Sequence, residues 1–146
     1  VLTRQNLPYY ENSGKQALKG GYILADSDKE TPDVILMASG SEVEQAMQAK
    51  EQLIKDGIDA RVVSMPSMEL FEKQSEEYKE SVLPKNVRAR VAVEAGSAYS
   101  WYKYVGLDGT TVCIDHFGAS APANILFKEF GFTAENVAEK AKSILK

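Results

Sequence analysis

The sequence has little of what builds metal sites, disulfides or membrane spans. Its 146 residues include one cysteine, Cys113, and one histidine, His116. A single cysteine cannot form an internal disulfide and is typical of a reducing compartment, so we expect a cytoplasmic protein. One cysteine and one histidine also argue against a zinc site made of the usual ligands. No apolar run approaches the roughly 20 residues that a membrane-spanning helix needs, so no membrane contact is expected.

Positive charge is scarce as well. The net charge is −4 and the isoelectric point about 5.1, which argues against binding nucleic acid or an anionic membrane surface. Hydrophobic residues make up 44% of the chain and charged residues 26%, the balance of a soluble globular protein. The length suits one domain of ordinary size.

The first residues do not read as the start of a protein. There is no initiator methionine, charged leader or apolar signal segment, and Val1-Leu2 runs directly into Thr3-Arg4-Gln5. This pattern is typical of the end of a strand and the loop that leaves it. We therefore expect residues 1–20, which are polar and irregular, to be the end of a preceding domain and a loosely held linker. Residues 21–146 are expected to form the domain proper.

From residue 21 onward, apolar strand-like segments alternate with helix-like ones. The expected strands are 22–25, 34–38, 60–65, 88–94 and 110–114. The expected helices are 41–57, 67–82 in two pieces, 100–105, 120–130 and one from 133 onward. Strands that alternate with helices predict a mostly parallel five-stranded sheet in a three-layer αβα sandwich, of the α/β class.

Two helix starts carry recognisable caps. Ser41, followed three residues later by Glu44, predicts a capping box. Ser120 is expected to cap a later helix, with Pro122 in its first turn.

Ligands of an open α/β sheet bind outside the carboxyl ends of its strands. Those ends are expected to carry Ser39-Gly40-Ser41, Ser64-Met65, Glu94 and Asp115-His116. The first of these turns lacks both G-x-G-x-x-G and G-x-x-x-x-G-K-[ST], so a capped helix start is favoured over a phosphate site. Asp115 and His116 are adjacent, and adjacent strand residues point to opposite faces, which argues against a shared proton.

The remaining candidates favour structural roles. Glu94 is expected to pair with a neighbouring N–H or base, and Cys113 to be a buried small hydrophobe. An aromatic cluster of Tyr99, Trp101, Tyr102 and Tyr104 is ambiguous. Trp101, Tyr104 and Val105 share a helical face, but the cluster as a whole fits either core packing beside the sheet or a contact surface. These residues alone indicate an α/β domain that binds a ligand or another subunit.

Longer motifs add a family resemblance. They are L-T-R-Q-N-L at 2–7, P-D-V-I-L-M-A-S-G-S-E at 32–42, V-A-V-E-A-G at 91–96, W-Y-K-Y-V-G at 101–106, F-G-A-S-A-P at 117–122 and F-G-F-T at 130–133. In this order they closely resemble the C-terminal third of transketolases, beginning just before the end of the middle, pyrimidine-binding domain.

The resemblance implies a parent enzyme that is a cytoplasmic homodimer. It would move a two-carbon ketol unit from ketose phosphates to aldose phosphates in the pentose phosphate pathway. Its cofactors would be thiamine diphosphate and a divalent cation, magnesium or calcium. The Gly-Asp-Gly…Asn motif that binds them is absent from this sequence, and Leu107-Asp108-Gly109 does not replace it. The chain by itself is therefore expected to be inactive and to serve in packing and dimer contacts.

One functional residue carries over from the family. Arg4, in the Thr-Arg-Gln segment, corresponds to an arginine that binds the substrate phosphate, and a guanidinium suits that task. Taken without the resemblance, an arginine so near a chain end would simply be solvated. Two alternatives stay open: a regulatory or small-molecule-binding α/β domain, and the equivalent domain of another thiamine-diphosphate enzyme.

Overall fold

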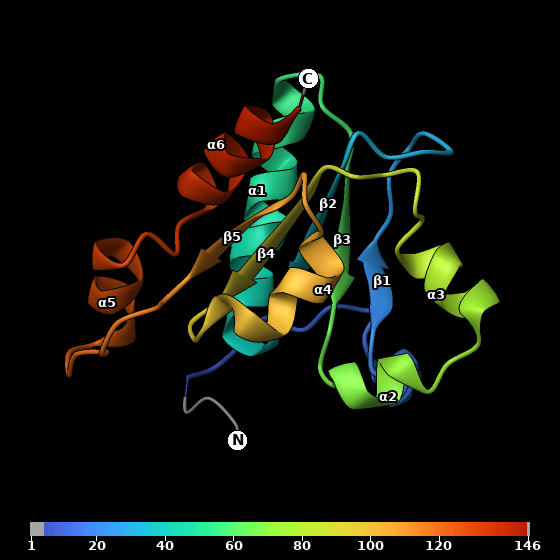
Figure 1. The fold of residues 1–146 in the computed structure, drawn as a ribbon. Coiled ribbons are helices and arrows are strands. Elements are labelled where there is room, and N and C mark those ends of the chain that lie inside the picture. Colours follow the sequence, from blue (N-terminus) through green and yellow to red (C-terminus); the bar gives the residue numbers. More distant parts are fainter. Residues whose placement is uncertain (1–4, 146) are drawn as a thin grey trace.

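A five-stranded sheet forms the centre of the computed structural model, which describes residues 5–145 (Figure 1). The strands are β1 (Tyr22–Ala25), β2 (Val34–Ala38), β3 (Ala60–Ser64), β4 (Arg90–Glu94) and β5 (Thr110–Cys113). Their order across the sheet is β1-β3-β2-β4-β5. Strands β3, β2, β4 and β5 run parallel, and β1 joins the edge of β3 antiparallel. The predicted mostly parallel sheet is confirmed.

The central strand β2 explains why the chain needs helices on both faces. All five of its residues are fully buried. Leu36 belongs to the core on one face of the sheet, and Met37, which follows it, belongs to the core on the other. Side chains alternate along a strand, so a strand that is apolar at every position has to be covered twice.

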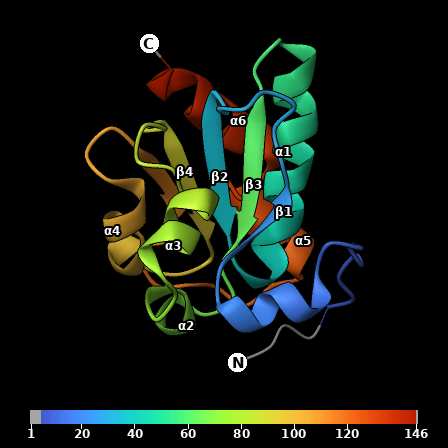
Figure 2. The same cartoon turned by 90° about the vertical axis from the view of Figure 1, so that its right-hand side faces the viewer.

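One helical layer consists of α1 (Val43–Lys55) and α6 (Ala134–Ile144), which pack against each other. The second consists of short elements: α2 (Met68–Glu72), α3 (Glu76–Val82), a 3-10 turn η3 (Ala98–Trp101) and α4 (Tyr102–Val105). Figure 2 shows the two layers on opposite faces of the sheet. The three-layer αβα sandwich is therefore confirmed.

The predicted capping box of Ser41 and Glu44 is wrong. A 3-10 turn, η2 (Gly40–Glu42), precedes α1. The hydroxyl of Ser41 donates to the Glu42 side chain, 3.2 Å away, while Glu44 accepts from Gln48. Both members of the expected box are thus engaged elsewhere, because Gly40 takes a left-handed conformation (φ 57°) that offsets the start of the helix.

The second predicted cap is also wrong. Helix α5 (Ala123–Glu129) begins after Pro122, which is its N-cap, and Ser120 lies outside it. A residue that precedes proline is disfavoured in the helical region, so residue 121 cannot belong to the helix. By contrast, the helical stretch predicted in two pieces is confirmed, because Ser67 caps α2 and Ser75 caps α3.

The segment before β1 is more ordered than the sequence indicated. A 3-10 helix, η1 (Gly14–Lys19), occupies part of the region expected to be irregular. Gly20 follows with φ 82°, and a Cβ there would lie 2.3 Å from the carbonyl oxygen of Ser67. The backbone N–H of Ser67 in turn donates to the carbonyl of Gly20 at 3.0 Å. Residues 14–20 are therefore docked against the start of α2.

This docking refines the expectation of a loosely held linker. We expect backbone amides in residues 6–12 to exchange with solvent rapidly, because Leu7 is 43% exposed and Tyr9 83% exposed. Amides of β1 and β2 should be strongly protected by their ladders. Hydrogen exchange followed by NMR measures both sets in one experiment. Protection at Leu7 equal to that in β2 would contradict the assignment of this segment to a linker.

Candidate functional site

The carboxyl edge of the sheet contains a topological switch point. From β2 the chain passes to β3 on one side, and from β3 it crosses back to β4 on the other. Such reversals leave a crevice between the two diverging strands, where ligands of α/β sheets bind. Ser39 follows β2 and Glu94 ends β4, and the Ser39 hydroxyl donates to Glu94 Oε2 at 2.6 Å. Glu94 therefore pairs with a neighbour, although its donor is a hydroxyl and not the predicted N–H or base.

A hollow of about 500 Å³ opens above these strand ends. Its polar lining consists mostly of serine hydroxyls together with the carboxylates of Glu69 and Glu94. No lysine or arginine lines it among the described residues. Two carboxylates without a basic partner repel phosphate, so this crevice does not fit a phosphorylated ligand.

Glu42 lies beside this crevice and was not singled out from the sequence. Its side chain is only 5% exposed. Burial is the main cause that raises its pKa, and the nearby charge of Glu94 raises it further. From the sequence, Glu42 could be interpreted only as part of a helix start. Its burial could not be predicted, because it depends on the 3-10 turn η2.

Glu42 predicts a pH dependence of stability with a definite sign. A raised pKa means that the folded chain binds this proton more tightly than the unfolded chain does. Ionisation of Glu42 therefore lowers the free energy of unfolding, beginning near the unfolded pKa and complete above the folded one. As the pH rises from the unfolded pKa of Glu42 through its raised folded pKa, Glu42→Gln should become progressively more stable relative to the wild type. Urea unfolding at several pH values measures this difference.

Glu135 provides a control of opposite sign. Hydrogen bonds from its own backbone and from Thr133 lower its pKa. Its ionised form therefore adds stability that is lost as the pH falls through the folded pKa. Glu135→Gln should become less stable relative to the wild type as the pH rises. If both variants changed in the same direction, the assigned role of Glu42 would be wrong.

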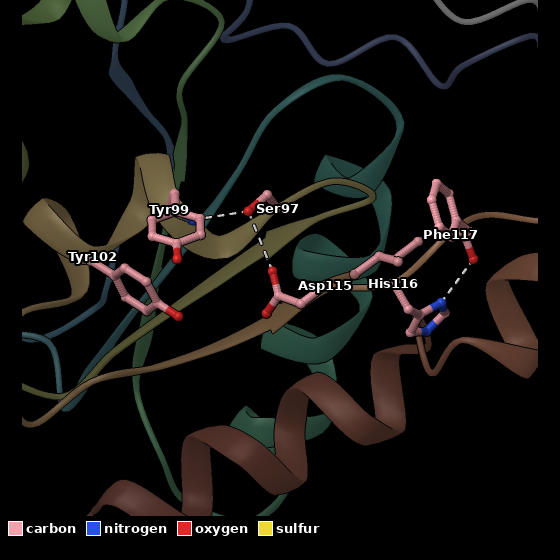
Figure 3. Close-up of a pocket in the computed structure, with 7 residues that line it drawn as sticks. Ser97, Tyr99, Tyr102, Asp115, His116 and Phe117 are labelled. Carbon is pink, nitrogen blue, oxygen red and sulfur yellow. Dashed lines mark hydrogen bonds between the residues drawn. The ribbon is translucent and has the colours of Figure 1, made fainter.

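A second hollow, of about 690 Å³, adjoins the first and shares Ser97 and Tyr99 with it. Figure 3 shows Tyr99 and Tyr102 on one side and the segment after β5 on the other. Asp115 Oδ1 accepts from the Ser97 hydroxyl and from the Ala98 N–H, both at 3.3 Å. Ser97 thus connects the two strand ends, a role that the sequence analysis missed although its position before the aromatic run could have indicated a cap.

Asp115 and His116 do not form an acid–base pair. The Asp115 carboxylate points toward Ser97, whereas the His116 ring points away from it (Figure 3). Nδ1 of His116 lies 2.9 Å from the Phe117 carbonyl oxygen, and the His116 ring packs in a T-shaped arrangement with Phe130, with ring centroids 5.2 Å apart. Both residues lie beyond β5, so the divergence comes from the loop rather than from strand alternation. The prediction that they do not share a proton is confirmed.

Both interpretations of the aromatic cluster apply, each to different members. Trp101 is fully buried and Tyr104 is 6% exposed, so these two belong to the core. Tyr99 is 84% exposed and Tyr102 54% exposed, so these two form a surface.

Cys113 is half-buried, and burial is the main cause that raises the pKa of its thiol to about 11. Its thiolate is therefore disfavoured, in agreement with the expected structural role.

Three further observations concern metal ligands, membrane-spanning helices and Arg4. Within residues 5–145 there is no cluster of three acidic, histidine or cysteine side chains placed to bind a metal ion. None of the helices in this part has the length and apolar character needed to cross a bilayer. Arg4, the predicted phosphate-binding residue, lies outside the described residues.

Comparison with known proteins gives a consistent result. Residues 20–133 match the family model described as the transketolase-like TK C-terminal domain. The chain is 55% identical over 148 residues to transketolase 1 of Escherichia coli, covering 99% of this chain and 22% of that protein. It is 50% identical over 149 residues to transketolase of Bacillus subtilis, with the same two coverages. The chain thus spans about 22% of the length of these relatives.

Solved structures agree with the sequence comparison. A transketolase from Pichia stipitis in complex with sedoheptulose 7-phosphate superposes with a TM-score of 0.88 at 45% identity, covering 97% of this chain and 20% of that one. Neither a regulatory domain nor the equivalent domain of another thiamine-diphosphate enzyme is favoured by these matches. The chain belongs to the transketolase family and corresponds to its C-terminal domain.

Proposed function

We propose that the parent protein is a transketolase that transfers a two-carbon ketol unit from ketose phosphates to aldose phosphates in the cytoplasm, as a step of the pentose phosphate pathway. The observation that carries this proposal is 55% identity to transketolase 1 of Escherichia coli over 99% of the chain. Solved relatives that bind xylulose 5-phosphate or sedoheptulose 7-phosphate support the class of substrate.

The residues of this domain do not fit the cofactors that the family implies. Thiamine diphosphate carries a diphosphate, but the crevice at the switch point presents Glu69 and Glu94 without a lysine or arginine in its lining. The described residues also offer no group of three ligands for magnesium or calcium. We therefore assign the cofactor, the metal ion and the ketol chemistry to the other domains of the parent.

The proposed role of this domain is packing within the parent and contact within a homodimer. Residues 115–122 are exposed throughout, and α5 has no buried residue. The same edge also carries the residues that precede η1, since Figures 1 and 2 both place them at the end of the sheet where α5 lies. A surface of this kind is suited to contact with other protein.

Arg4 is proposed to bind the phosphate of the sugar substrate in the parent enzyme. A charge-assisted hydrogen bond to phosphate contributes about 1.5–3 kcal/mol. Arg4→Ala in the full-length parent should therefore weaken the use of phosphorylated sugars by about one to two decades. The phosphate is remote from the reacting carbons, so the loss should appear mainly in KM.

Two controls separate this role from a role in folding. Non-phosphorylated substrates such as hydroxypyruvate and glycolaldehyde should be almost unaffected by Arg4→Ala. The variant Arg88→Ala should leave KM for sugar phosphates unchanged, because Arg88 pairs with Asp108 at the opposite, amino end of β4. Equal losses for phosphorylated and non-phosphorylated substrates would show that Arg4 supports the fold instead.

A further inference from the structure

The hollow between Tyr99, Tyr102 and Asp115 has chemistry that neither the fold nor ketol transfer explains. We propose that it receives an arginine side chain presented by another protein surface of the assembled parent. This inference rests on the proposed role of the domain in packing and dimer contact, and it names the chemistry of that contact. The reasons are the charge of the lining, the geometry of the acceptors and the exposed apolar surface beside them.

The charge of the lining selects a cation. Asp115 is the only carboxylate among the described lining residues, and no lysine or arginine accompanies it. The adjoining hollow adds Glu94 and Glu69, again without a basic side chain in its lining. The linings of these two hollows are thus complementary to a positive charge.

Asp115 is held in place with acceptor capacity to spare. Hydrogen bonds from the Ser97 hydroxyl and from the backbone N–H of Ala98 both go to Oδ1 of Asp115. An ionised carboxylate has about four lone-pair positions, so Oδ2 remains able to accept further N–H donors. A guanidinium group presents its donors in a fixed planar fork that matches a carboxylate.

Tyr99 and Tyr102 form the aromatic part of the proposed arginine site. Their ring centroids lie 5.9 Å apart with an interplanar angle of 77°, an edge-to-face pair. In this arrangement the edge of one ring meets the face of the other. Tyr99 is 84% exposed and Tyr102 54% exposed, so both leave aromatic surface accessible at the hollow that they line. A planar guanidinium stacks on an aromatic face while pairing with a carboxylate, whereas the compact ammonium of lysine cannot do both as well.

Exposed apolar side chains indicate that the arginine belongs to a protein rather than to a free amine. Phe117, which lines the hollow, is 99% exposed, and Ile125, on the helix α5 that follows the exposed segment 115–122, is 49% exposed. A small cationic ligand would leave both in water, while a protein surface would cover them together with the exposed segment 115–122. A purely apolar partner is disfavoured as well, because it would bury the Asp115 carboxylate without a partner.

NMR titration of the 146-residue chain tests this inference directly. The probe is N-acetyl-arginine methylamide, and its matched control is the neutral isostere N-acetyl-citrulline methylamide. We expect saturable shifts at Tyr99, Tyr102 and Asp115 with the arginine probe and none with the citrulline probe. Saturating shifts with citrulline, or equal affinity for N-acetyl-lysine methylamide, would overturn the assignment of arginine.

Variants distinguish specific binding of the arginine probe in the hollow from general electrostatic attraction of the probe to an acidic chain. Asp115→Asn and Tyr99→Ala should each weaken binding at least five-fold, while Asp28→Asn, an exposed aspartate outside the hollow, should leave it unchanged. Equal weakening by all three variants would show nonspecific binding and overturn the inference. Ketol transfer by the full-length parent tests the proposed function separately, since failure of arginine binding leaves that assay unaffected.

Discussion

The purified 146-residue chain is expected to show no ketol transfer from xylulose 5-phosphate when thiamine diphosphate and magnesium ion are both supplied. Enzymes of this kind depend on a cofactor to stabilise the carbanion, and the protein must position it. The Gly-Asp-Gly…Asn motif is missing from the sequence, and the carboxyl-edge crevice is lined by carboxylates. Since enzymes accelerate reactions by at least about 10⁶-fold, loss of the cofactor site should abolish detectable turnover.

A coupled spectrophotometric assay, with the full-length parent as the positive control, measures this expectation. A second measurement asks whether the cofactor binds at all. A ligand present at about 100 times its Kd adds about 2.7 kcal/mol to the free energy of unfolding. Thiamine diphosphate with magnesium should therefore leave the thermal midpoint of this chain unchanged. Turnover that depends on the added cofactor would contradict the proposal that the cofactor and the ketol chemistry belong to the other domains of the parent.

Trp101→Ala should destabilise the domain by about 3–5 kcal/mol, a large fraction of the roughly 5–15 kcal/mol typical of a domain. Trp101 is the largest of the fully buried side chains and packs edge-to-face against Tyr104 with ring centroids 6.4 Å apart. It belongs to the core between the sheet and the second helical layer. Its removal leaves a cavity that the rigid sheet cannot fill.

Tyr99 provides the matched control for this prediction, because it lies on the same 3-10 turn but is 84% exposed. Tyr99→Ala should change stability by no more than about 0.5 kcal/mol. Urea unfolding followed by far-ultraviolet circular dichroism suits all variants, since Trp101 is the only tryptophan. Equal losses for the two alanine variants would contradict the assignment of Trp101 to the core.

If Trp101→Ala fails to fold, the variant Trp101→Phe tests the same prediction. The Trp101 indole N–H is buried and has no hydrogen-bond partner among the described residues. Phenylalanine removes this unsatisfied donor while keeping an aromatic ring, so part of the lost packing is offset. We expect its loss of stability to be clearly smaller than that of Trp101→Ala.

The fold class was predictable from the sequence because it follows from local patterns. A run such as Val34–Ala38, apolar at every position, can satisfy its backbone only in a sheet and its side chains only between two layers. Spacing on a helical face grouped Trp101 with Tyr104, but only the structure showed that these two are buried in the core. The antiparallel edge strand β1 was not predicted, because four residues carry no signal for the direction of pairing.

The candidate site was predictable only in outline. The rule for strand ends correctly indicated Ser39, Glu94 and Asp115 as residues of one edge. It could not show that Ser97 connects to Asp115, or that Tyr99 and Tyr102 turn outward beside them. Arg4 stays a prediction, since it came from family resemblance and lies outside the described residues.

The sequence by itself determined the layers, the family and the edge at which functional groups gather, since periodicity and motifs are properties of neighbours along the chain. Tertiary structure alone decided which of those groups meet. Ser39 and Glu94 are 55 residues apart in sequence and share a 2.6 Å hydrogen bond. That bond engages the Ser39 hydroxyl directly before η2, and Glu42 is buried beside it. Such contacts depend on strand order, which no local pattern encodes.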